Sequence, residues 1–64
     1  GYDATTGQVM VVYDAALSRE GGTRVETRRF EASAPAAGTA ATVAPALNQA
    51  ANAVALQVAG WVGQ

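Results

Sequence analysis

The stretch from Thr42 to Val62 limits the possible folds more than any other part of this chain. Its larger apolar side chains recur at the spacing of one helix face, while its Asn and Gln side chains fall on other faces. We therefore predict an amphipathic α-helix over residues 42–62. Such a helix must bury its apolar stripe, and we expect its packing surface among the preceding residues.

Two segments before the helix have the composition of β-strands. Residues 8–19 (QVMVVYDAALSR) and residues 23–34 (TRVETRRFEASA) contain β-branched and aromatic side chains at many positions. The turn between them spans residues 20–23, and its central Gly21 and Gly22 suit a tight hairpin turn that requires positive φ angles. The sequence therefore predicts an antiparallel hairpin.

A two-residue turn at Gly21 and Gly22 also sets the pairing of the two strands. Tyr13 then opposes Phe30 on one face, and Asp14 opposes Arg29 on the other. A slip by one residue would mix the apolar and charged faces, so we expect this register to be specific. Near the turn Arg19 opposes Arg24, an unfavourable pair, and we expect fraying or a bulge there.

The remaining segments complete a ββα unit of the α+β class, which we expect to be part of a larger α+β domain. Residues 1–7 read as a loop in which Tyr2 ends an earlier strand, and residues 35–41 read as a linker. Thr39 or Thr42 is the expected helix cap, Pro45 is expected in the first turn, and Gly63 is the expected left-handed residue after the helix. The predicted core consists of Val9, Val11, Tyr13, Phe30, Leu47, Val54, Val58 and Trp61.

The composition excludes several classes of chemistry. The 64 residues contain neither Cys nor His, so disulfides and the usual zinc, haem and iron–sulfur ligand sets are absent. Ser18 and Ser33 lack a His or Lys that could activate them as nucleophiles. The net charge of −1 gives no basic surface for nucleic acid. We therefore expect no catalytic residues, no cofactor and no metal site, and we expect that the protein is not an enzyme.

The predicted helix carries no charge, because all nine charged residues lie between Asp3 and Glu31. Its length, about 20 residues, would suffice to cross a bilayer, but Pro45 and the cluster of Asn and Gln make it too polar for that role. Leu56 falls opposite the apolar stripe. An exposed Leu on an uncharged face is a possible contact for a partner protein, together with Asn52.

Two segments resemble a known protein family. RRFEASAP (residues 28–35) and ALNQAANAVALQVAGWV (residues 46–62) are similar to the C-terminal part of the ABC-type transport auxiliary lipoproteins, the paraquat-inducible C-type family. The matching positions are Arg28, Arg29, Phe30, Pro35, Ala46, Leu47, Asn48, Ala51, Val54 and Trp61. The similarity extends to nearly the whole chain, because the elements also follow the same order. A hairpin is followed by a Pro-containing linker and then by an Ala-rich helix with a Trp near its C-terminal end.

The resemblance implies a function that the residues alone do not. It implies a C-terminal fragment of a periplasmic, membrane-anchored lipoprotein of a Gram-negative envelope, whose lipid anchor lies outside these residues. The role would be a non-enzymatic accessory of intermembrane lipid transport, with an MCE-domain protein and ABC transporter subunits as partners. The alternative is a ββα protein-interaction module without a transport role.

Overall fold

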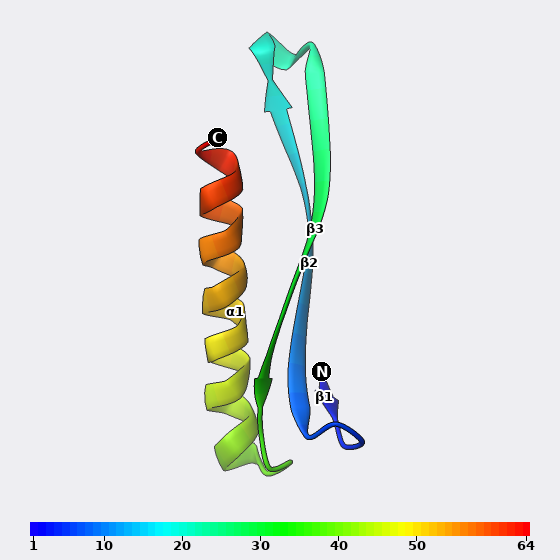
Figure 1. The fold of residues 1–64 in the computed structure, drawn as a ribbon, viewed down its shortest axis with the longest axis vertical. Helices are drawn as coiled ribbons and strands as arrows, with labels where there is room; N and C mark the ends of the chain where they lie inside the picture. Colours follow the sequence, from blue (N-terminus) through cyan, green and yellow to red (C-terminus); the bar gives the residue numbers. More distant parts are fainter.

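A computed structural model describes all 64 residues and shows a three-stranded antiparallel sheet with one helix packed on it. The elements are β1 (Tyr2–Asp3), β2 (Gln8–Arg19), the short 3₁₀ turn η1 (Glu20–Gly22), β3 (Arg24–Pro35) and α1 (Ala40–Val62). The strand order is β1-β2-β3. Figure 1 shows a long twisted hairpin whose tip extends past the C-terminal end of α1. The α+β class and the hairpin-then-helix order are confirmed.

The hairpin has the predicted register over its whole length. Tyr13 pairs with Phe30 and Asp14 pairs with Arg29, and the ladder continues without a bulge to Arg19 and Arg24. The expected fraying near the turn is therefore absent. Gly21 and Gly22 have φ angles of 66° and 87°, the left-handed values of a primed hairpin turn, but Glu20 also has a positive φ of 55°, so the backbone is irregular within the turn and not in the ladder.

The helix begins earlier than predicted and ends differently. Thr39 is its N-cap, and the Thr42 hydroxyl oxygen accepts hydrogen bonds from the backbone N–H groups of Thr39 (3.3 Å) and Ala37 (3.1 Å). Pro45 consequently lies past the first turn, against our expectation. Gly63 follows the helix as expected, but its φ of −78° is not left-handed. The helix therefore ends without the predicted glycine cap.

The core lies between α1 and the sheet face that carries the odd-numbered side chains of β2. It forms two clusters. The first joins Val9 and Ala34 of the sheet to Ala46 and Ala50 of the helix. The second joins Phe30 to Val54 and Trp61. The rings of Phe30 and Trp61 lie 5.5 Å apart between centroids at an angle of 55°, a tilted geometry that aromatic pairs favour.

The structure corrects two of the predicted core positions. Val9, Phe30, Val54 and Trp61 are buried, and Val11 and Val58 are half-buried, but Tyr13 is 51% exposed and Leu47 is 41% exposed. The buried line of α1 runs through the small Ala46 and Ala50, which leaves the larger Leu47 to one side. Tyr13 lies at the margin of the helix contact because Phe30, its cross-strand neighbour, occupies the place beneath Trp61.

Replacing Trp61 by Ala tests the larger cluster. We expect Trp61→Ala to lower the free energy of unfolding by about 3–5 kcal/mol, because it removes the largest side chain of the core and leaves a cavity. Urea unfolding followed by circular dichroism measures this loss. Leu56→Ala is the matched control on the same helix, and its exposed position predicts a change within about 0.5 kcal/mol. A loss under about 1 kcal/mol at Trp61 would contradict the core assignment.

Candidate functional site

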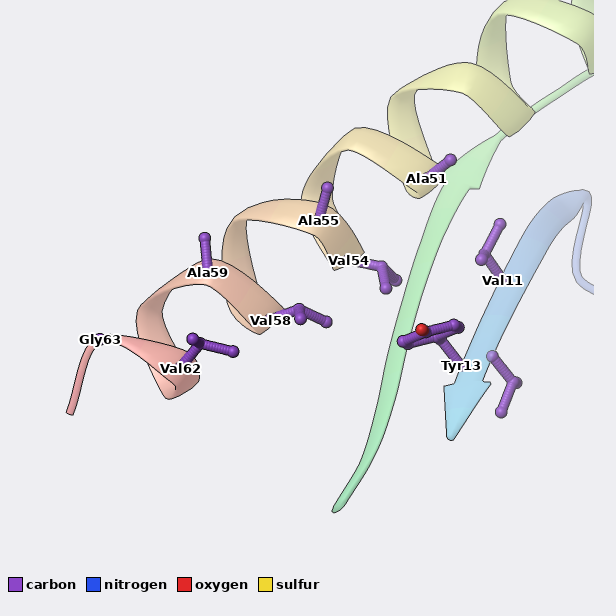
Figure 2. A pocket seen from close by; sticks show the side chains of 10 residues that line it. Val11, Tyr13, Ala51, Val54, Ala55, Val58, Ala59, Val62 and Gly63 are labelled. Atoms are coloured by element: carbon purple, nitrogen blue, oxygen red, sulfur yellow. The ribbon is translucent and has the colours of Figure 1, made fainter. Parts of the chain in front are cut away.

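An apolar groove lies between α1 and β2. It has a volume of about 740 Å³ and is lined by Val11, Val12, Tyr13, Ala51, Val54, Ala55, Val58, Ala59, Val62 and Gly63. Figure 2 shows Val54, Val58 and Val62 pointing from the helix toward the strands, with Val11 and Tyr13 on the strand side. No charged side chain lines the groove, so it fits an apolar occupant.

The sequence-predicted contact residues lie on a different surface. Leu56 is 75% exposed, and Asn52 is exposed four residues earlier, so both lie on the same face of α1. That face carries no charge. The groove escaped prediction because Tyr13 was expected beneath the helix. The alternation of β2 places Tyr13 on the helix face but does not say how far the helix reaches across the sheet.

Arg19 makes a contact that the sequence did not indicate. Its Nη2 donates a hydrogen bond to the Trp61 carbonyl (3.2 Å) and its Nη1 to the Gln64 carbonyl (3.1 Å). Its Nε pairs with the Glu26 carboxylate at 3.1 Å. A guanidinium beside the last carbonyls of a helix is favourable, because these groups carry partial negative charge. Arg19 therefore links the end of α1 to the hairpin, and the Glu26 carboxylate, which pairs with both Arg19 and Arg24, offsets the repulsion between the two arginines.

The neighbouring arginines of β3, Arg28 and Arg29, make separate contacts. The guanidinium of Arg28 lies over the Trp61 ring, 5.4 Å from its centroid, on the helix side of the sheet. Arg29 lies on the other side and forms two hydrogen bonds with the Asp14 carboxylate, at 2.7 and 3.1 Å. The two side chains therefore do not form one anion-binding site. The predicted cross-strand pair of Asp14 and Arg29 is present.

Hydrogen bonding within this pair shifts the pKa of both side chains. The hydrogen bonds from Arg29 are the main cause that lowers the pKa of Asp14 below its ordinary value of 3.8. The reciprocal bonds to Asp14 raise the pKa of Arg29. Both side chains are exposed, so the pair adds little to stability. Its arrangement is that of a surface ion pair on a sheet.

A second, more polar hollow of about 450 Å³ is lined by Asp14, Ala15, Ala16, Thr27, Arg28 and Arg29. Acidic side chains form no group of three or more that could hold a metal ion. No helix has both the length and the apolar character needed to cross a bilayer. Comparison with known proteins found no matching family model, no matching curated protein and no matching solved structure. The groove and the outer face of α1 are thus the surfaces on which a functional interpretation depends.

The ion pair gives a pH-dependent prediction. In NMR titration, the midpoint of the Asp14 carboxyl should lie below 3.8, and Arg29→Gln should move it upward because the hydrogen bonds are lost. A lowered folded-state pKa means that the pair stabilises the protein above the unfolded pKa and loses this effect as pH falls through the folded value. An Asp14 midpoint that Arg29→Gln leaves unchanged would contradict the assignment.

Proposed function

We propose that this chain is a non-enzymatic, protein-binding accessory module of an MCE/ABC-type intermembrane lipid transport system. The proposal has two parts with different support. Exposed apolar side chains on the surface of the fold support the first part, protein binding. The transport setting, with its periplasmic and lipid-anchored location, follows from the resemblance of residues 28–35 and 46–62 to the auxiliary lipoproteins.

The balance of exposed and buried apolar side chains supports protein binding. Only seven residues are buried, whereas eight large hydrophobic side chains are exposed. The exposed ones are Tyr2, Met10, Val12, Tyr13, Val25, Leu47, Leu56 and Val62. Three of them, Val12, Tyr13 and Val62, line the groove between α1 and β2, and an apolar groove of this kind marks sites of interaction because its contact with water is unfavourable. A domain of about 60 residues buries only about 60% of the surface that its unfolded chain exposes, so burial against another polypeptide would add to its stability.

The arrangement of elements is compatible with the transport setting. The RRF-like segment lies on β3, where Phe30 contacts Trp61, so the two family-like motifs meet in one cluster. Arg28 lies over the same Trp ring. The residues that carry the resemblance therefore serve the packing of the helix on the hairpin. Partner binding then belongs to surfaces outside this cluster.

The outer face of α1 favours a second candidate, a ββα interaction module with no transport role. Leu56 is the most exposed large hydrophobic side chain in the chain, and Asn52 next to it offers an amide for hydrogen bonding. An apolar anchor with a polar neighbour suits many protein partners. This surface by itself carries no mark of lipid transport.

Binding to an MCE-domain protein from the same organism tests the transport proposal. We expect the purified chain to bind it, and we expect Leu56→Asp to weaken binding at least tenfold by placing a charge in the contact. Thr27→Asp is the control, because Thr27 is exposed on the sheet face away from the helix. Calorimetry measures both affinities, and circular dichroism verifies that both variants fold.

The gene supplies an independent check. Neighbouring genes for an ATPase, a permease and an MCE protein, with a lipidated Cys encoded upstream, are expected under the transport proposal. Failure to bind any MCE protein, together with unrelated neighbouring genes, would leave the interaction module as the function of this chain.

A further inference from the structure

The last pair of the hairpin brings two like charges together. Arg19 of β2 lies directly opposite Arg24 of β3, at the closed end of the ladder. Like charges at directly opposed positions of an antiparallel pair are destabilising. The ladder nevertheless continues to this pair without a bulge. Another group must therefore hold the hairpin tip, residues 18–25, in its paired form.

One carboxylate bridges the two arginines. Glu26 Oε2 lies 3.1 Å from Nε of Arg19, and Glu26 Oε1 lies 3.4 Å from Nη2 of Arg24. The side chains of Arg19 and Glu26 are only 27% and 29% exposed, so solvent screens their contact less than that of a fully exposed pair. Each carboxylate oxygen thus contacts one arginine, and a single negative charge lies between two positive charges.

No other acidic side chain can replace Glu26. Glu20 approaches only Arg24, at 3.9 Å, and the Glu20 side chain is 65% exposed. Arg28 lies two residues further along the same face of β3 and adds a positive charge. Strand β2 places the uncharged Leu17 opposite Glu26, and α1 carries no charged side chain. Loss of the Glu26 charge would therefore leave the two opposed arginines with only one weak acidic contact.

We propose that Glu26 is an acid-sensitive switch for the hairpin tip. While its carboxylate is ionised, it offsets the repulsion between the opposed arginines and the tip stays paired. When acid protonates this carboxylate, Arg19 and Arg24 repel each other and the tip opens more often. Arg19 then also leaves the Trp61 carbonyl, so the opening loosens the end of α1. This inference goes beyond the proposed function and does not depend on it.

The fold confines this opening to the tip. Figure 1 shows that the tip extends past the C-terminal end of α1, so no helix packs on it. Nearer the middle of the hairpin, Tyr13 pairs with Phe30, whose ring lies 5.5 Å from that of Trp61 between centroids. That aromatic contact contains no acidic group. The middle of the hairpin should therefore stay paired in acid that opens the tip.

Amide hydrogen exchange measured by NMR resolves the two regions. Odd-numbered residues of β2 direct their N–H groups toward β3, because the even-numbered Met10 directs its own away from it. The amides of Arg19 and Arg24 are therefore the tip amides, and those of Tyr13 and Phe30 are the middle amides. Protection factors allow comparison across pH, because they divide each rate by the intrinsic exchange rate at the same pH.

Glu26→Gln removes the charge while it keeps the shape of the side chain. At neutral pH, we expect about fivefold lower protection of the tip amides and unchanged protection of the middle amides. In the native chain, acid should lower the protection of the tip amides by a similar factor. This selective acid effect should be absent from Glu26→Gln. The control is Glu31→Gln, because Glu31 is exposed on the same strand but lies on the face away from α1, and the tip amides should stay protected.

A second substitution separates charge repulsion from the loss of a hydrogen bond. Adding Arg24→Gln to Glu26→Gln removes one of the two like charges without restoring the carboxylate. We expect the protection of the Arg19 amide to return to within about twofold of its native value, because the opposed repulsion has gone. Circular dichroism verifies that each variant is folded.

Three results would overturn the proposal. One is native protection of the tip amides in Glu26→Gln at neutral pH. Another is an acid effect on the tip amides that is as large in Glu26→Gln as in the native chain, since another group would then be responsible. The third is a double variant whose tip remains as open as that of Glu26→Gln, which would exclude repulsion between the arginines as the cause.

Discussion

The packing of Trp61 on Phe30 joins two elements that are each weak alone. An isolated two-stranded hairpin is marginally stable in water, and most of the stability of a protein helix comes from tertiary packing. The aromatic contact lies where the C-terminal half of α1 crosses β3, with Arg28 over the Trp ring and Arg19 bonded to the carbonyls at the end of the helix. The register of the hairpin and the end of the helix thus depend on each other.

Much of the fold was predictable because local signals agreed. The Gly21–Gly22 pair specifies a tight turn, and the alternation on both sides of it permits only one favourable register, the one observed. Strand β2 has the expected bounds, β3 lies one residue later, and α1 starts two residues earlier. These features follow from turn geometry and periodicity, which act over a few neighbouring residues.

The deviations come from packing across elements. Periodicity predicts the direction of the helix stripe but favours its larger side chains, so it places Leu47 in the core, where the structure has Ala46 and Ala50. The small residues are buried because they let the helix approach Val9 and Ala34 closely. The hairpin register predicts only that Arg19 opposes Arg24, because the hydrogen bonds of Arg19 to Trp61 and Gln64 span more than forty residues of sequence. The groove arises because the helix does not extend over Tyr13, which stays exposed.

The two core clusters contribute unequally to the packing of the helix on the sheet. Alanines supply the helix side of the cluster under its N-terminal half, whereas Trp61 and Val54 anchor the C-terminal half. Pro45 further weakens the first half by removing a backbone donor. Fluctuations of the native state should therefore begin at Ala40 and spread toward Val54, while the aromatic end remains docked.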